Sequence, residues 1–203
     1  KQILLNLPKK IIILDHSEFN LYFIHENLNQ LKIENKINTE IIPALLSIQD
    51  KLNLENLFLK YDINHIYHAA AYKHVPLLEE NIIEAIKNNI IGTNNLIRLT
   101  NKYEVSKFIL VSTDKAVRPT NIMGATKRFS EMLVQASADD IKSTNKTTFA
   151  IVRFGNVVNS SGSVIPLFSK QIKEGGPITV THPDVTRYFM TIPEAASLIL
   201  QSS

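Results

Sequence analysis

The residues that could do chemistry in this chain lie together in one stretch with the sequence VSTDKAVRPTNIMGATKR. Thr113, Asp114 and Lys115 directly follow an apolar segment, and three polar residues at such a place indicate a cleft at the end of a strand. Met123 and Lys127 are four residues apart at the expected start of a helix, so they share one face. A hydroxyl, an acid and an amine could move protons between them, whereas a methionine thioether cannot gain or lose one at neutral pH.

Each of these residues also has an ordinary structural interpretation, which the sequence leaves open. Thr113 or Asp114 could cap a short turn after the strand. A lysine at helical spacing, such as Lys127, is most often solvated on the surface. The spacing from Thr113 to Met123, rather than any single residue, favours a functional set.

Around this stretch, strand-like and helix-like segments alternate and predict an α/β fold. The expected strands are Lys9–Asp15, Glu40–Ser47, Ile63–Ala71, Lys107–Thr113 and Thr147–Asn156. The expected helices are a run capped by Ser17, the segment LNLENLFLKY, Asn81–Tyr103 and Ala125–Ala138. This alternation is typical of a Rossmann-like, doubly wound parallel sheet with helices on both faces.

The pattern also predicts how the chain is divided. We expect residues 1–156 to form a partial NAD(P)-binding Rossmann domain that includes the catalytic segment, and residues 157–203 to begin a small, irregular substrate-binding lobe. Lys1–Leu7 has the pattern of the tail of a helix, and nothing before it supplies the strand and Gly-rich turn that cradle a pyrophosphate. We therefore expect the sheet to lack its first strand and Gly-rich loop.

Composition excludes several classes of protein. Hydrophobic residues make up 44% of the 203 residues, which supports a buried core, and the net charge of +3 comes with scattered lysines, so we expect no nucleic-acid partner. The absence of Cys excludes disulfides and Cys-based zinc sites and suits a cytoplasmic setting. No His, Asp or Glu cluster has metal-ligand spacing, so we expect no metal. No apolar run has the length needed to span a membrane.

Two further strand ends suit a nucleotide cofactor. Asp15 stands where an acid would bind the ribose hydroxyls of NAD, and no Arg follows it to favour NADP. Ala69, Ala70 and Ala71 would let a cofactor approach the backbone closely. Asp15 could instead be a solvated loop residue, and the alanines could be simple packing.

The order of motifs gives a specific resemblance. The segments YHAAAYKHVPLLEEN, NNIIGT, VSTDKAVRPTNIMGATKR, VRFGNVV, SSGSVIPLF and THPDVTRYFMTIPEAA follow one another from Tyr67 onwards. Together they resemble the catalytic domain of the membrane-anchored UDP-N-acetylglucosamine 4,6-dehydratases, which are extended short-chain dehydrogenase/reductase enzymes. The long branch of this family is similar in having Met where shorter relatives have Tyr, which accounts for Met123.

The resemblance implies a redox-neutral dehydration of a nucleotide sugar with NAD, with NADP as the alternative. Hydride leaves sugar C4 and returns to C6, while a base removes the C5 proton and an acid assists loss of the C6 hydroxyl. It implies Asp114 as the acid, Lys115 as the base and Thr113 as the partner of the C4 hydroxyl. The acid would need a raised pKa and the base a lowered one, and a tight ion pair between them would oppose both.

The resemblance also implies the binding residues and the partners. The cofactor-binding set is Asp15, Ser47, Ile48, Ala69, Ala70, Ala71, Lys73, Asn89 and Lys127. The substrate-binding set is Lys73, His74, Arg118, Asn156, Ser163, Val164 and Arg187, in which the two arginines suit a diphosphate unless they form surface salt bridges. It implies a homo-oligomer, located in the cytoplasm or at the cytoplasmic face of the inner membrane if the full-length protein is membrane-anchored.

Two other functions stay open at this point. A nucleotide-sugar epimerase shares the fold and the hydride removal, but a C4 epimerase normally relies on the Tyr that Met123 replaces. A non-catalytic relic or binding module is the alternative from another class, because the Gly-rich loop is lacking.

Overall fold

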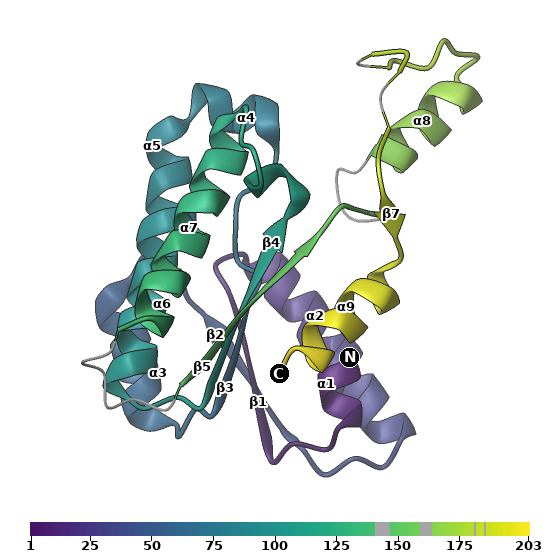
Figure 1. Ribbon diagram of the computed structural model, residues 1–203. Helices are drawn as coiled ribbons and strands as arrows, with labels where there is room; N and C mark the ends of the chain where they lie inside the picture. The colour runs from purple at the N-terminus through teal and green to yellow at the C-terminus, as the bar shows by residue number, and fades with distance from the viewer. Residues whose placement is uncertain (141–146, 159–163, 181, 185) are drawn as a thin grey trace.

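The computed structural model describes residues 1–140, 147–158, 164–180, 182–184 and 186–203. Its main strands are all parallel and form two sheets (Figure 1). One sheet pairs β1 (Lys10–Asp15) with β2 (Glu40–Leu45), and the other has the order β3 (His65–His68), β4 (Lys107–Thr113), β5 (Thr148–Phe154). The α/β, Rossmann-like prediction is therefore confirmed.

The strand register brings the carboxyl ends of neighbouring strands level with one another. Asp15 at the end of β1 lies opposite Leu45, and Thr113 at the end of β4 lies opposite Phe154. Among the described residues, no pairing joins β1 to β3. In a doubly wound sheet of order 3-2-1-4-5, the position of this break is that of a central strand.

Helices cover both faces of the strands (Figure 1). On one side α2 (Glu18–Glu34) packs on β1 and β2, and α9 (Ile192–Gln201) contacts β5 and the short α1 (Gln2–Leu5). On the other side lie α3 (Lys51–Lys60), α6 (Thr93–Lys102) and α7 (Ile122–Ala138). This layering is what the alternating sequence pattern predicted.

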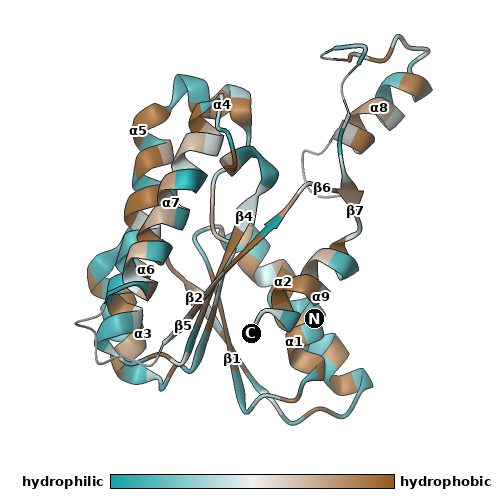
Figure 2. Cartoon of the chain, viewed as in Figure 1, coloured by the Kyte–Doolittle hydropathy of each residue, from teal (hydrophilic) through white to brown (hydrophobic). Residues whose placement is uncertain are grey.

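The main core lies between the strands and the helices α3, α6 and α7, where Figure 2 shows apolar strands facing the helical layer. Leu54 and Phe58 from α3 pack with Phe108 and Leu110 from β4. Leu14 of β1 and Ile66 of β3 pack against the same cluster, so one core spans both sheets. Each fully buried Leu or Phe contributes roughly 1.5–3 kcal/mol to folding.

The helix expected over Asn81–Tyr103 is one continuous helical segment with an altered middle. It begins as α5 (Ile82–Ala85), becomes a π-helix, η1 (Ile86–Gly92), and continues as α6. The wider π turn buries two neighbouring side chains, Asn88 and Asn89, which a regular helix would direct to different faces. Apolar periodicity predicted the helix but could not show the change of winding.

The last part of the chain is more regular than predicted. The strand β6 (Asn156–Val157) pairs with β7 (Phe189–Met190), and α8 (Val164–Lys173) lies between them in sequence. Thr191 and Glu194 form a capping box that begins α9. Because α9 contacts β5 and Tyr67 Oη donates to Ser203 Oγ at 3.1 Å, the end of the expected lobe packs on the sheet domain.

Within the described ranges, no helix is both long and apolar enough to span a bilayer.

Candidate active site

The Thr113-Asp114-Lys115 trio lies where β4 ends and a short 3-10 turn, η2 (Asp114–Ala116), begins. Thr113 Oγ1 donates to Asp114 Oδ1 at 2.9 Å, and Lys115 Nζ donates to the same oxygen at 3.1 Å. Lys115 Nζ also donates to Asn156 Oδ1 at 3.2 Å, from the segment after β5. The ends of β4 and β5 are thus linked by a polar cluster that remains partly exposed to solvent.

The capping interpretation of this trio is also confirmed. Thr113 Oγ1 accepts a hydrogen bond from Lys115 N at 3.4 Å, as an N-cap of η2 does. One hydroxyl can serve both purposes, because it has a donor proton for Asp114 and lone pairs for the backbone.

The protonation of Asp114 differs from what the predicted acid requires. Partial burial raises the pKa of the Asp114 carboxyl, but the hydrogen bonds from Thr113 and Lys115 outweigh it and hold that pKa below its usual range. An acid at this position would need the opposite shift. The structure therefore shows the tight ion pair that opposes the roles predicted for both residues, and in this state Asp114 is a carboxylate.

Met123 is buried at the start of α7. Its side chain is 5% exposed and packs with Leu78 and Ala85, from α4 (Val75–Glu80) and α5. The first turn of α7 faces α4, because Glu79 Oε1 of α4 accepts from Ile122 N at 2.8 Å. Met123 is therefore a packing residue that holds α7 against α4.

Lys127 lies one turn later on α7 and is buried, with 6% of the residue exposed, so it is not the solvated surface lysine considered above. Its Nζ donates to the carbonyl of Val111 on β4 at 2.7 Å. Burial lowers the pKa of the Lys127 ammonium to about 8, against an opposing effect of Glu131. An ammonium held at a strand with an altered pKa is typical of functional sites.

Asn89 is 1% exposed, and its side-chain amide is hydrogen-bonded within the protein. Its Oδ1 accepts from Tyr72 N at 2.8 Å, and its Nδ2 donates to Tyr72 O at 3.1 Å and to Thr126 Oγ1 at 3.1 Å. The amide thus fixes the backbone that leads into Lys73 and His74. Asn89 thus orders this segment, and its predicted contact with the cofactor stays a prediction.

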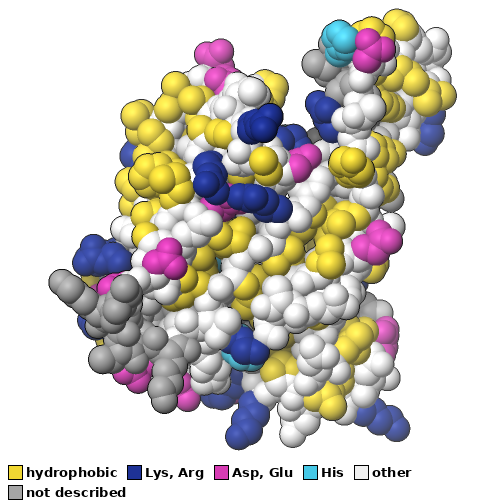
Figure 3. Space-filling view, viewed as in Figure 1, with side chains coloured by type: hydrophobic (Ala, Val, Ile, Leu, Met, Phe, Trp, Pro, Cys, Tyr) yellow, Lys and Arg dark blue, Asp and Glu magenta, His cyan; other side chains and the backbone are white. Residues whose placement is uncertain are grey.

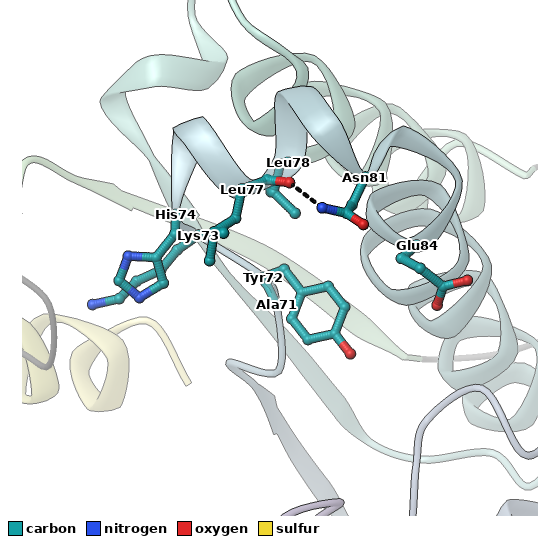
Figure 4. A pocket seen from close by; sticks show the side chains of 8 residues that line it. All are labelled: Ala71, Tyr72, Lys73, His74, Leu77, Leu78, Asn81 and Glu84. Atoms are coloured by element: carbon teal, nitrogen blue, oxygen red, sulfur yellow. Dashed lines mark hydrogen bonds between the residues drawn. The ribbon is translucent and has the colours of Figure 1, made fainter.

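A hollow of about 420 Å³ opens beside the same segment (Figure 4). In this view the Tyr72 ring and the Glu84 carboxylate lie on one side, and Lys73 and His74 point away on the other. Asn81 Nδ2 donates to Leu77 O at 2.8 Å on its wall. The lining residues are Ala71, Tyr72, Lys73, His74, Leu77, Leu78, Asn81 and Glu84. The hollow includes part of the predicted binding set but not the trio.

The residues predicted to bind the cofactor lie mainly at strand ends. Asp15 Oδ1 accepts from Ser17 N at 2.8 Å and is 3.6 Å from His16 Nδ1, and Ala69 and Ala70 are exposed. Ser47 Oγ accepts from Gln49 N at 3.2 Å. Ile48 is different, because its side chain is buried in the core. It can offer a cofactor only its backbone, and its carbonyl already accepts from Asn95 Nδ2 at 3.1 Å.

Of the remaining predicted substrate residues, the structure describes the surroundings of the two arginines. Arg118 is exposed in the turn before α7, and Arg187 is exposed with its Nη1 donating to Thr186 O at 2.7 Å. Val164 is the first residue of α8, but its side chain is not among the described features, and Ser163 lies outside the described residues. In the described part of the chain, no three His, Cys, Asp or Glu side chains are close enough to hold a metal ion.

Sequence reasoning missed two residues that shape the site. A Cβ on Gly124 would lie 2.5 Å from the Lys115 carbonyl oxygen, so only glycine lets α7 approach η2 this closely. Glu131 is fully buried and bonded to Ser112 of β4 and Arg153 of β5. A role for Glu131 could have been predicted from the sequence, because Glu131 follows Lys127 by four residues and therefore lies on the same face of α7.

Comparison with known sequences places the chain in a family. The family described as polysaccharide biosynthesis protein matches residues 1–203. The chain is 52% identical over 195 residues to capsular polysaccharide biosynthesis protein CapD of Staphylococcus aureus. The aligned residues cover 96% of this chain and 32% of CapD. The chain is 42% identical over 140 residues to a UDP-glucose 4-epimerase of Rickettsia canadensis, covering 69% of this chain and 41% of the relative.

A third relative, the probable polysaccharide biosynthesis protein EpsC of Bacillus subtilis, is 48% identical over 197 residues, which are 96% of this chain and 31% of EpsC. The chain thus spans about a third of the length of CapD and EpsC.

Solved structures show the same fold. Pen from Bacillus thuringiensis superposes with a TM-score of 0.87 at 35% identity, covering 99% of this chain and 59% of Pen. A double mutant of the dTDP-glucose 4,6-dehydratase DesIV of Streptomyces venezuelae, solved with NAD and DAU bound, superposes with a TM-score of 0.79 at 18% identity, covering 99% of this chain and 65% of DesIV. At that identity the second likeness concerns the fold alone.

Proposed function

Since the chain belongs to the polysaccharide biosynthesis protein family, we propose that it carries the catalytic segment of an NDP-sugar 4,6-dehydratase acting on UDP-N-acetylglucosamine. One observation carries the proposal: the residue four before Lys127 is a buried methionine, while an Asp114–Lys115 pair stands open at the adjacent strand end. The groups available for proton transfer are therefore next to each other on η2 and not on α7. This arrangement suits a reaction that needs an acid and a base on one sugar.

The residues at the strand ends fit NAD. Asp15 offers a partly exposed carboxylate for ribose hydroxyls, Ala69 and Ala70 leave the backbone approachable, and Lys127 supplies an ammonium at β4. No Arg follows Asp15, so NADP is the weaker alternative. When bound, NAD+ would supply a hydride acceptor for sugar C4 and, once reduced, a donor for C6.

The trio can handle the protons of this reaction. We assign Thr113 Oγ1 to hydrogen-bond the C4 hydroxyl, whose proton passes to solvent as the hydride leaves C4. Lys115 Nζ removes the C5 proton and gives a proton back to C5 when the hydride returns to C6. Asp114 protonates the C6 hydroxyl, which leaves as water, and regains a proton from solvent. The ion pair opposes these roles, but one proton moved from Lys115 Nζ to Asp114 Oδ1 across their 3.1 Å hydrogen bond creates both the acid and the base. A bound sugar that excludes water would favour this neutral pair, since desolvation disfavours charges.

The substrate charge fits the surface of this region. Figure 3 shows Lys and Arg side chains gathered in this view around the upper ends of α7 and β4. A UDP-sugar carries a negatively charged diphosphate, which positively charged Lys and Arg side chains attract. We keep Lys73, His74, Arg118, Asn156, Ser163, Val164 and Arg187 as the proposed substrate contacts.

An epimerase is the second candidate, because the Rickettsia relative is named a UDP-glucose 4-epimerase. Both reactions begin with hydride removal at C4, and only the dehydratase loses water. A binding module without catalysis is the third possibility, and the same experiment tests it.

The test is proton NMR of UDP-N-acetylglucosamine incubated in deuterated water with NAD+ and the full-length protein that contains this chain. A 4-keto-6-deoxy product with deuterium at C5 is expected from the wild type and not from Lys115→Met. The exposed Lys9→Met variant, just before β1 and so at the opposite edge of the sheet, should behave as the wild type. An epimer without water loss would favour the second candidate, and no conversion by a folded protein would reject the dehydratase for this substrate.

We further propose a homo-oligomer. Large apolar side chains are exposed on the adjacent helices α5, η1 and α7, where a second copy would cover them: Ile83, Ile91, Phe129 and Met132. Light scattering on the wild type and on Phe129→Glu would test this, with a smaller particle expected from the variant.

We also propose a cytoplasmic site of action, at the inner face of the membrane if the full-length protein has an anchor. One relative is named uncharacterized membrane protein MJ1061.

A further inference from the structure

Glu131 is a fully buried carboxylate at the junction of α7, β4 and β5. Its Oε1 accepts from Ser112 Oγ at 2.6 Å and from Arg153 Nε at 2.7 Å. Its Oε2 accepts from Arg153 Nη2 at 2.5 Å and from Arg128 Nη1 at 3.0 Å. Both oxygens are therefore used, and the fork of Arg153 binds the carboxylate in the bidentate geometry that fixes orientation.

The partners of Glu131 lie directly before the proposed catalytic groups. Ser112 and Arg153 are paired in the register of β4 and β5. Ser112 precedes Thr113, and Arg153 lies three residues before Asn156. Further along the two strands, Lys115 Nζ donates to Asn156 Oδ1. The ends of β4 and β5 are therefore linked by side-chain hydrogen bonds at two successive positions.

Glu131 also lies one helical turn after Lys127 and affects the pKa of the Lys127 ammonium. The two side chains are four residues apart on α7, and the negative charge of Glu131 raises the pKa of Lys127 against the effect of burial. The neighbouring His68 of β3 is buried and bonded to Thr93, and burial together with the Lys127 charge lowers its pKa to about 3, so it is neutral at pH 7. Arg128 and Arg153 are the other charged groups bonded to the Glu131 carboxylate.

We propose that Glu131 is a positioning residue, which sets the separation of the β4 and β5 ends through Ser112 and Arg153. It touches neither a substrate nor a cofactor in this role. A purely structural ion pair would stabilise the fold without affecting the groups beyond the strand ends. The kinetic part of this inference rests on the proposed function, but its geometric part does not.

Two substitutions separate geometry from charge in the full-length protein. Glu131→Asp keeps the charge but withdraws the oxygens, whereas Glu131→Gln keeps the reach but removes the charge. We expect both to lower kcat by about 10- to 100-fold with KM changed by less than about threefold, as for a misplacement of about 1 Å. Only Glu131→Gln should lower the apparent pKa of Lys127, which NMR of labelled lysine would measure as a function of pH.

The control is Glu55→Gln, which removes a carboxylate paired with Lys102 on the far helices and should leave kcat unchanged. If the Glu131 variants do not fold, Ser112→Ala removes one hydroxyl from the carboxylate and should lower kcat in the same direction. Variants that lose thermal stability but keep kcat would overturn the proposal, and so would an unchanged kcat in Ser112→Ala.

The amide chemical shifts of Thr113, Lys115 and Asn156 provide a readout without turnover. They should move in Glu131→Asp, and unmoved shifts would overturn the proposal. A wild type that forms no dehydrated product would reject the proposed function while leaving this NMR test intact. The two failures are thus distinguishable.

Discussion

Replacing Lys127 by methionine should remove one specific pH dependence from the stability of the protein. The Lys127 residue is 6% exposed, and burial lowers the pKa of its ammonium from 10.5 to about 8. Methionine has a similar length and helix propensity and cannot ionise. The substitution therefore deletes the charge while changing the packing of α7 little.

The size of the effect follows from these two pKa values. The difference between 10.5 and about 8, at about 1.4 kcal/mol per pH unit, amounts to roughly 3 kcal/mol. Below pH 8 the lysine is protonated in both states, and the full cost of burying its charge is present. Between pH 8 and 10.5 the native state binds fewer protons at Lys127 than the unfolded state, so the free energy of unfolding contributed by Lys127 rises with pH.

Urea unfolding of the wild type and Lys127→Met from pH 7 to 10.5 measures this contribution. The free energy of unfolding of the wild type minus that of the variant should be constant up to about pH 8 and then rise by roughly 3 kcal/mol. The exposed Lys51→Met should show no such rise. A difference that stays flat for Lys127→Met would mean that this lysine keeps an ordinary pKa in the native state, and the reasoning from burial would be refuted.

Three other perturbations follow from the packing of the site. Gly124→Ala places a Cβ 2.5 Å from the Lys115 carbonyl oxygen, so it should destabilise the fold by about 1–3 kcal/mol in urea unfolding and shift the Lys115 amide resonance; an unchanged resonance would contradict the close contact. Burial lowers the pKa of His68 to about 3, so the wild type should lose stability as pH falls from 6.5 towards 3, and thermal melts of His68→Gln should lack part of this loss. Asn89→Ala leaves the partly buried backbone amide and carbonyl of Tyr72 without their partner and should cost about 2 kcal/mol or more, measured by urea unfolding. A loss below about 0.5 kcal/mol would argue against a positioning role of Asn89.

The strands and the order of the elements were predictable from the sequence. The run Lys107–Thr113 has the bounds of β4, and the other expected strands differ from the observed ones by a few residues at their ends. A β-branched or aromatic run that alternates with amphipathic helices has one compatible arrangement, the covered parallel sheet. The position of Thr113, Asp114 and Lys115 at its carboxyl edge follows from that arrangement alone.

The surroundings of individual side chains were decided by the tertiary structure. Lys127 and Met123 share a helix face in the sequence, but Met123 packs on α4 whereas Lys127 reaches the Val111 carbonyl of β4, and both neighbours come from distant segments. Asn89 turns inward because of a π turn that no periodicity shows, and Glu131 meets Arg153 only when α7 crosses β5. The sequence by itself determined which residues occur at the strand ends. Burial and charge pairing depend on neighbours brought from distant segments, so the pKa values and the roles of these residues were decided only by the folded structure.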